Sequence, residues 1–209
     1  MPNTDDSAPD AGAILKAYYR PGSKIYDLLQ RHGEQVGVKA RRAAGRVSHL
    51  KPDLDFIGAA ALLHDIGIFL TQTPQLGCHG RYPYICHGYL GRQLLEDRGL
   101  PRHALVCERH VGVGITVEDI RTRNLPLPAR DMRPVTIEEK LVCYADKFYS
   151  KTNGHCGREK TFAEIVHKLK KYSRRQSETF IRWAGQYEGI FLNADGGRTA
   201  PPQRGKIAF

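Results

Sequence analysis

The chain has 209 residues, of which 41% are hydrophobic and 26% are charged. This composition is ordinary for a soluble globular protein, and the length suffices for one well-packed domain with an appendage. No stretch approaches the roughly 18 to 20 uninterrupted apolar residues that a membrane span requires. The formal net charge of +10 favours anionic substrates or nucleic acid as partners.

The N-terminal segment 1–12, MPNTDDSAPDAG, is acidic and lacks the basic and apolar regions of a signal peptide. We therefore predict a disordered leader and a cytoplasmic protein. The five cysteines have no CxxC spacing, and their odd number argues against a closed disulfide framework. Reduced thiols are the expectation that follows.

The remainder of the chain predicts an all-α fold. Apolar residues recur at helical spacing from Lys24 to about Ala44, which predicts a first long helix. Breaks at Gly and Pro make residues 71–86 a predicted loop. A short helix is compatible with residues 117–123. Further helices are expected, in chain order, over residues 53–64, 87–96, 101–111, 136–151 and 161–187.

Two units follow from this pattern, a compact helical domain over residues 13–151 and a basic C-terminal helix and tail over residues 152–209. From Lys151 to the end, 12 lysines and arginines stand against 5 acidic residues. Such a surplus favours an anionic partner, and a solvated basic helix face explains it equally well.

The apolar run AALLHDIG, residues 60–67, is interrupted by His64 and Asp65 where a protein core is expected. Burying a carboxylate without a partner costs several kcal/mol. The sequence therefore requires a positively charged or hydrogen-bonding group in front of this pair.

Helical phase places further ligand-type side chains on the same inner surface. His32 lies four residues after Leu28, and Asp146 lies four after Val142, so both share an apolar helix face. A single such histidine is more often a hydrogen-bonded core residue than a metal ligand. A set that includes two carboxylates instead favours a pair of divalent cations. The six candidates are His32, His64, Asp65, His87, His110 and Asp146.

These residues resemble the H…HD…D signature of the HD-domain superfamily of metal-dependent phosphohydrolases, and HDIG at 64–67 matches its HDIG subgroup. The segments ERHVGVGIT (108–116) and TIEEKLVCYADKFYSK (136–151) look like a bacterial and archaeal branch of small stand-alone HD proteins. The resemblance covers roughly residues 20–151. It implies an all-α HD-domain bundle around a metal site, followed by a C-terminal helical extension.

The resemblance also implies how the ligands divide between two metals. His32, His64, Asp65 and Asp146 would hold the first ion, and Asp65 would bridge to a second ion held by His87 and His110. One or two divalent ions are expected, and the His/Asp set accepts Mn²⁺, Fe²⁺, Mg²⁺, Zn²⁺ or Ni²⁺. HD-GYP cyclic-dinucleotide phosphodiesterases carry Lys where this chain has Ile68, and the GYP triplet is missing from its expected place.

The leading hypothesis is hydrolysis of a phosphate ester, with a nucleotide or a small phosphorylated metabolite as substrate. Asp65 would bridge the ions and orient the attacking water. Lys147 and Arg109 are candidates for neutralising charge on the phosphate, and Lys147 is also a substrate-binding candidate. His79 and Arg81, in the predicted loop, are candidates for reaching the substrate. We expect replacement of His103 to have little effect.

Two alternatives stay open at this level. Some HD-superfamily proteins resemble this chain in their six ligands but use a di-iron centre for O₂-dependent cleavage. Alternatively, the basic C-terminal helix contacts nucleic acid, although helical spacing scatters its charges around the circumference. The basic residues of this helix are Lys168, Lys170, Lys171, Arg174, Arg175 and Arg182. The sequence does not indicate an oligomeric state.

Overall fold

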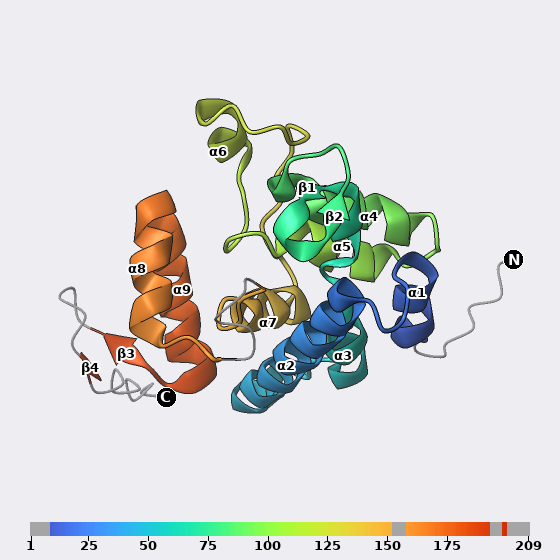
Figure 1. The fold of residues 1–209 in the computed structure, drawn as a ribbon. Helices are drawn as coiled ribbons and strands as arrows, with labels where there is room; N and C mark the ends of the chain where they lie inside the picture. Colours follow the sequence, from blue (N-terminus) through green and yellow to red (C-terminus); the bar gives the residue numbers. More distant parts are fainter. Residues whose placement is uncertain (1–8, 152–157, 193–197, 200–209) are drawn as a thin grey trace, which may run out of the picture.

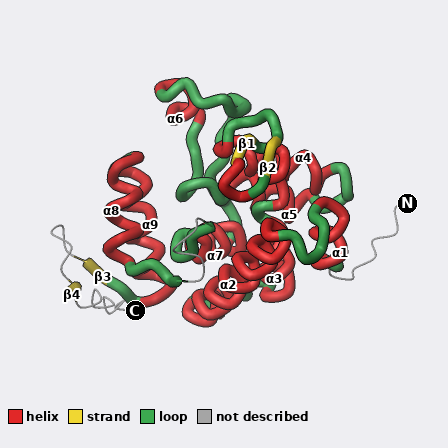
Figure 2. Tube along the Cα trace, in the orientation of Figure 1, coloured by secondary structure: helices red, strands yellow, loops and turns green. Residues whose placement is uncertain are grey.

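The computed structural model describes residues 9–151, 158–192 and 198–199, and every structural statement below refers to these residues. Helices account for most of the trace (Figure 2). In chain order they are α1 (Ala11–Tyr18), α2 (Lys24–Arg46), α3 (Leu54–Leu63), α4 (His87–Glu96), α5 (Pro101–Arg109), α6 (Val117–Thr122), α7 (Ile137–Asp146), α8 (Phe162–Tyr172) and α9 (Arg174–Glu188).

Short elements connect these helices. Two small antiparallel pairings join β1 (Gln72–Thr73) to β2 (Cys78–His79) and β3 (Phe191–Leu192) to β4 (Arg198–Thr199). Single-turn 3₁₀ segments are η1 (Ser48–Leu50), η2 (Ile66–Leu70), η3 (Pro74–Leu76) and η4 (Tyr84–Cys86). The all-α prediction is confirmed, with η3, β1 and β2 lying inside the loop that was predicted at 71–86.

The helices form a bundle in which α2 packs along α3 and α7, while α4 packs against α5 and η2 (Figure 1). The start of α2 is set by Ser23, whose hydroxyl accepts a hydrogen bond from the Tyr26 amide. One stripe of α2 is fully buried, including Val36 and Ala40, which have 0% exposure. This stripe also carries His32, so the packing that buries α2 fixes the position of that imidazole.

The C-terminal extension packs on the bundle as a helical hairpin. A single helix over 161–187 was predicted, and this is wrong: Ser173 is extended (φ −167°, ψ 137°) and separates α8 from α9. The break lets α8 fold back along α9, where Phe180 is fully buried and stacks on Tyr144. Lys39 of α2 also pairs with Glu159 at 2.6 Å and with Glu188 at 2.7 Å.

Two other boundaries differ from the prediction. Helix α1 begins at Ala11, inside the segment predicted as a disordered leader, and residues 1–8 lie outside the described part. Asp10 caps α1 by accepting a hydrogen bond from the Ala13 amide. The predicted helix 136–151 ends earlier, at Asp146, and its last residues form turns.

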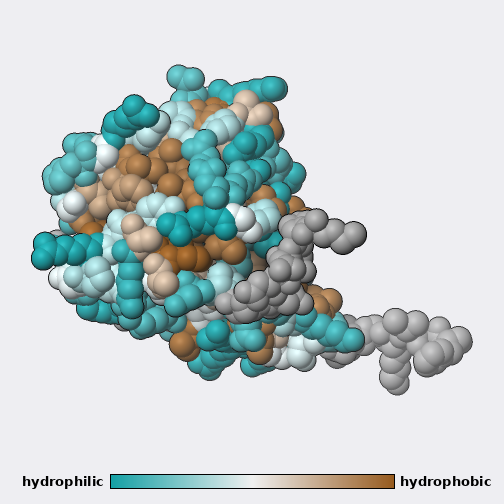
Figure 3. Space-filling model, turned by 90° about the vertical axis from the view of Figure 1, so that its right-hand side faces the viewer, coloured by the Kyte–Doolittle hydropathy of each residue, from teal (hydrophilic) through white to brown (hydrophobic). Residues whose placement is uncertain are grey.

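The surface and the thiols add two findings. Figure 3 shows the face that includes α1 and α4, where hydrophobic side chains lie among hydrophilic ones. Of the described helices, none combines the length and apolar character that crossing a bilayer demands.

The four cysteines in the described part are buried and free, and Cys156 lies outside it.

Candidate metal centre

The candidate ligands lie almost entirely at helix ends. His64 follows the last residue of α3, and Asp65 comes directly after it. His87 opens α4, His110 follows the last residue of α5, and Asp146 is the last residue of α7. His32 is the exception, because it lies within α2. All six side chains are buried, with at most 7% exposure.

The first cluster combines two imidazoles and two carboxylates. His32 Nε2 lies 3.0 Å from Asp146 Oδ1 and 3.2 Å from His64 Nε2. His64 Nε2 lies 3.0 Å from Asp65 Oδ2. These four residues each offer a ligand atom within 4.8 Å of the others, so together they could hold one metal ion.

The second cluster shares Asp65 with the first. His87 Nε2 lies 3.0 Å from His110 Nε2 and 3.3 Å from Asp65 Oδ1. Asp65 therefore presents Oδ2 to one cluster and Oδ1 to the other. A carboxylate with one oxygen in each of two adjacent ligand sets has the arrangement of a bridging ligand.

The hydrogen bonds behind the imidazoles favour cation binding. Nδ1 of His64, His87 and His110 lies 2.6 to 2.7 Å from the backbone carbonyls of Ala61, Tyr84 and Cys107 respectively. A neutral imidazole that donates from Nδ1 carries its lone pair on Nε2, the atom that faces the cluster. These outer hydrogen bonds thus orient three imidazoles so that Nε2 of each faces the clusters.

The carboxylate at the centre has one cationic neighbour from the described lysines. Lys151 Nζ lies 2.7 Å from Asp65 Oδ2, and neither buried oxygen of Asp65 accepts a further hydrogen bond of normal geometry from the described residues. Nε2 lone pairs and carboxylate oxygens that converge in a buried space repel one another, and a cation between them would offset this repulsion. The donor set of imidazole nitrogens and carboxylate oxygens therefore fits divalent metal ions.

Titration behaviour agrees with a cation-binding centre. Burial lowers the pKa of His32 to about 4 and that of His87 to about 3, which keeps both imidazoles neutral at pH 7. Burial would raise the pKa of Asp65, but the charges of His64 and Lys151 outweigh burial and hold it well below its usual value. The centre therefore presents ionised Asp65 together with the neutral imidazoles of His32 and His87.

Lys151 is a site residue that sequence reasoning missed. Its Nζ lies 2.7 Å from Asp65 Oδ2 and 3.4 Å from Asp146 Oδ1. Because α7 ends at Asp146, the chain turns and brings the lysine five residues later back to the carboxylates. The sequence signal for this contact is the short distance of five residues between Asp146 and Lys151 in DKFYSK. A helix that continued to residue 151, as predicted, would not turn the lysine back toward the carboxylates.

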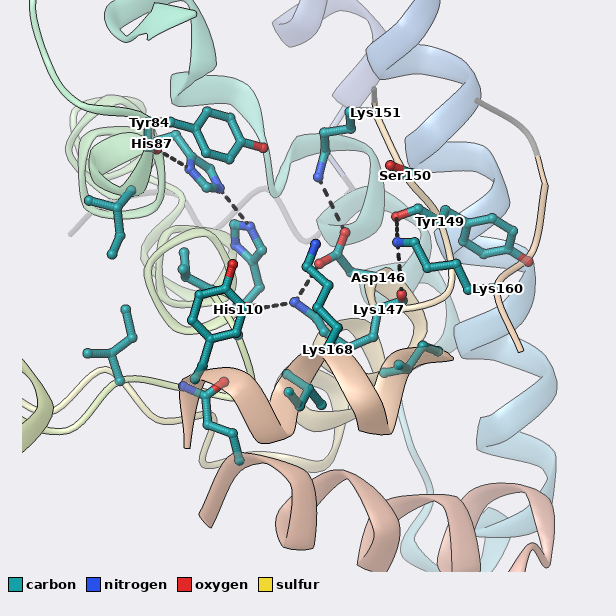
Figure 4. Close-up of a pocket in the computed structure, with 18 of the residues that line it drawn as sticks. Tyr84, His87, His110, Asp146, Lys147, Tyr149, Ser150, Lys151, Lys160 and Lys168 are labelled. Atoms are coloured by element: carbon teal, nitrogen blue, oxygen red, sulfur yellow. Dashed lines mark hydrogen bonds and ion pairs between the residues drawn. The ribbon is translucent and has the colours of Figure 1, made fainter. Parts of the chain in front are cut away.

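A pocket of about 480 Å³ opens beside the two clusters (Figure 4). His87, His110 and Asp146 form part of its wall, so the candidate metal centre is reached from this space. Further walls come from Tyr84 in η4, from the connection around α6, and from α8. The Tyr84 ring stacks on the His87 imidazole with ring centroids 4.6 Å apart.

Of the other candidates, the structure brings Lys147 to the site. Its Nζ lies 2.7 Å from Asp146 Oδ2 and donates to the His110 carbonyl at 3.0 Å. Arg109 points elsewhere: its guanidinium pairs with buried Glu139 at 2.9 Å, and it does not line the pocket. An ion pair with a buried acid explains Arg109 as a structural residue.

The two loop candidates are likewise not brought to the pocket. His79 is exposed in β2, and the Arg81 guanidinium lies over the Tyr82 ring, 4.9 Å from its centroid. The hairpin of β1 and β2 turns these side chains outward, which a loop without assigned geometry could not reveal. His103 lies apart from both clusters, against the Phe56 ring.

A helical bundle that buries two adjoining His/Asp clusters is typical of metal-binding helical proteins. The HD domain family model matches residues 27–151, more than half of the chain, and the chain therefore belongs to the HD-domain family. The structure also resembles the HD domain of the L. monocytogenes phosphodiesterase PgpH, with a TM-score of 0.50 and 12% sequence identity. That match covers 90% of this chain and 91% of the other, and it concerns the fold.

Proteins of other organisms are similar to this chain in sequence. An uncharacterized protein of Methanocaldococcus jannaschii is 36% identical over 124 residues, which is 59% of this chain and 61% of that protein. The tRNA (cytidine(56)-2'-O)-methyltransferase of Picrophilus torridus is 37% identical over 125 residues, 59% of this chain and 32% of that enzyme. The enzyme of the same name from Thermoplasma volcanium is 32% identical over 143 residues, 68% of this chain and 37% of that enzyme. The matched region thus spans less than two thirds of each relative.

Proposed function

We propose that this protein is a metal-dependent phosphohydrolase that acts on a nucleotide or another phosphate ester. Membership in the HD-domain family supports hydrolysis of the HD type, and the His/Asp clusters could hold the metal. The observation that carries the proposal is Asp65, whose two oxygens face two separate ligand sets. His32, His64, Asp65 and Asp146 would hold one ion, and Asp65, His87 and His110 would hold a second.

Divalent ions bound there would supply Lewis-acid chemistry and lower the pKa of a water molecule into the neutral range. The chain contributes orientation and charge around that centre. Asp65 and Asp146 are ionised and can accept hydrogen bonds from a nucleophilic water. Lys147 and Lys151 place ammonium groups at these carboxylates, where they can offset negative charge on a phosphoryl group.

The pocket favours a small substrate. Its volume of about 480 Å³ is in the range of small-molecule sites and accommodates a nucleotide. Apolar side chains such as Ile85, Ile115 and Leu125 also line the pocket. They can contact the organic portion of an ester while its phosphate reaches the ligand clusters.

The test begins with metal analysis of the purified protein, followed by phosphate release from a panel of phosphomonoesters and phosphodiesters with the metals found. We expect Asp65→Ala to lower metal content and to reduce phosphate release at least about 1,000-fold, because it removes a ligand of both sites. His103→Leu is the matched control, since His103 is a buried imidazole outside both clusters.

Three outcomes would contradict the proposal. Full metal content in Asp65→Ala would remove Asp65 from the ligand set. A panel without any metal-dependent release would remove the hydrolase activity. Cleavage that requires O₂ would favour the di-iron alternative, whereas release that continues under anaerobic conditions would exclude it.

RNA is a second candidate partner. Two of the similar proteins are named tRNA methyltransferases, and this chain matches about a third of each. The net charge of +10 and the exposed Lys170 and Lys171 on α8 favour binding to phosphates. Filter binding of tRNA at rising salt is the test, because phosphate-mediated affinity must fall steeply. An affinity that stays flat with salt would exclude this role.

A further inference from the structure

One wall of the pocket is built by residues that follow the family-model match, which ends at residue 151. This wall includes Lys160 and, from α8, Ile165, Lys168, Leu169 and Tyr172. The extension therefore does more than cover the bundle, since it faces the same space as His110 and Asp146 (Figure 4). Residues outside the HD-domain match can thereby influence which substrate the centre accepts.

The lysines in this wall differ from three arginines of the extension, each of which pairs with a carboxylate. Arg158 pairs with Glu164, Arg174 with Glu178, and Arg175 with Asp119. Within the described residues, by contrast, neither Lys160 nor Lys168 forms an ion pair with a carboxylate. Their positive charges consequently face the pocket without a protein counterion.

Lys160 is held firmly in place. Its Nζ donates to the carbonyls of Lys147 at 3.3 Å and of Tyr149 at 3.2 Å. Two of its three protons are therefore used to position the ammonium, and the third is available to a ligand. Burial and then the nearby charge of Lys168 lower the pKa of Lys160 to about 8.

Lys168 adds a second ammonium group to this wall from α8. Figure 4 shows its side chain rising from α8 into the pocket, toward the side where Asp146 and Lys147 lie. Leu169 and Tyr172 flank it on the same wall and supply apolar surface. An anion bound between Lys160 and Lys168 would offset the repulsion between their positive charges. Phosphate is such an anion, because its oxygens can accept hydrogen bonds from both ammonium groups.

We propose that Lys160 and Lys168 form a second phosphate-binding subsite, so that the substrate is a small organic molecule carrying two phosphate groups. This inference rests on the proposed function, because it places the phosphate to be cleaved at the His/Asp clusters. The second phosphate would bind the two lysines, and the carbon skeleton would lie along the apolar wall. Lys160 and Lys168 are substrate-binding residues in this scheme.

Bisphosphonates test the subsite without turnover, because their P–C bonds resist hydrolysis. The experiment measures binding to the metal-loaded protein by calorimetry, for methylphosphonate and for alkylene bisphosphonates with one to four methylene groups. We expect at least one bisphosphonate to bind at least tenfold more tightly than methylphosphonate. The double variant Lys160→Ala/Lys168→Ala should lose at least fivefold of that gain and keep its affinity for methylphosphonate.

The matched control is Lys170→Ala/Lys171→Ala, which removes two lysines of α8 that do not line the pocket. This variant should retain the full advantage of the bisphosphonate. Bisphosphonates that bind no more tightly than methylphosphonate would overturn the subsite, as would an advantage that survives loss of Lys160 and Lys168. Phosphate release is measured separately, so failure of hydrolysis and failure of the subsite give different results.

Discussion

At the scale of residues, the centre is balanced by cations that belong to the chain itself. Lys151 contacts Asp65, Lys147 contacts Asp146, and the two carboxylates raise the pKa of His64 to about 9 against the effect of burial. Each of these positive groups neutralises a carboxylate that a bound metal ion would neutralise instead. Metal binding is therefore expected to displace a proton from His64.

Lys151 gives the first prediction at this scale. Lys151→Ala should bind divalent metal about tenfold more tightly, because the ammonium no longer competes for Asp65 Oδ2 at 2.7 Å. Competition titration with a fluorescent chelator measures this change. Lys170→Ala serves as the control for loss of one positive charge. Weaker metal binding by Lys151→Ala would show that the lysine supports the ion instead of competing with it.

At the scale of elements, two glycines let backbones approach where the ligands converge. A Cβ on Gly33 of α2 would lie 2.7 Å from Leu62 Cα of α3. A Cβ on Gly67 of η2 would collide with the His87 carbonyl oxygen and lie 2.5 Å from the Gly91 amide nitrogen of α4. Gly67 is the glycine of the HDIG motif, so its physical role here is the close contact that holds His87 near Asp65.

The second prediction follows from this contact. Gly67→Ala should lower the free energy of unfolding by about 2 kcal/mol or more, because α4 must move away from η2. The movement should also weaken the cluster of His87 and His110 and lower the metal content. Urea unfolding and metal analysis measure the two effects.

A matched glycine provides the control for that prediction. Gly45 lies exposed in α2, and a Cβ there would meet nothing within 4 Å. Gly45→Ala should leave metal content unchanged and stabilise the protein by about 0.5–1 kcal/mol, as expected for helix propensity. Equal effects of the two substitutions would contradict a specific role for Gly67.

At the scale of the whole molecule, the ligands couple metal binding to folding. The six side chains come from positions between His32 and Asp146, so only the folded bundle brings them together. An ion that binds the folded chain alone stabilises it by about 2.7 kcal/mol at 100 times its dissociation constant.

This coupling gives the third prediction. Removing metal with a chelator should lower the thermal midpoint of unfolding by roughly 5–10 °C, the shift expected for that energy in a chain of this size. Differential scanning calorimetry of loaded and chelated protein measures it. Asp65→Ala should show little difference between the two conditions. Identical midpoints for the loaded and chelated wild-type protein would mean that no stabilising ion binds there.

The sequence by itself determined the all-α class, the positions of most helices and the six ligand-type residues. It could do so because helical periodicity is local, and because buried His and Asp in an apolar run demand a partner wherever they lie. The order and spacing of His32, His64, Asp65 and Asp146 were also enough to predict the family, because members of the family carry this motif on the same set of helices.

Only the tertiary structure decided where the remaining charges point. Arg109 follows Glu108 and precedes His110 in sequence, yet it turns to Glu139, because which buried acid it meets depends on how α5 packs on α7. Lys151 and Lys168 reach the pocket because α7 ends early and Ser173 breaks the C-terminal helix. Such turns depend on contacts between distant segments, and local patterns carry no record of those contacts.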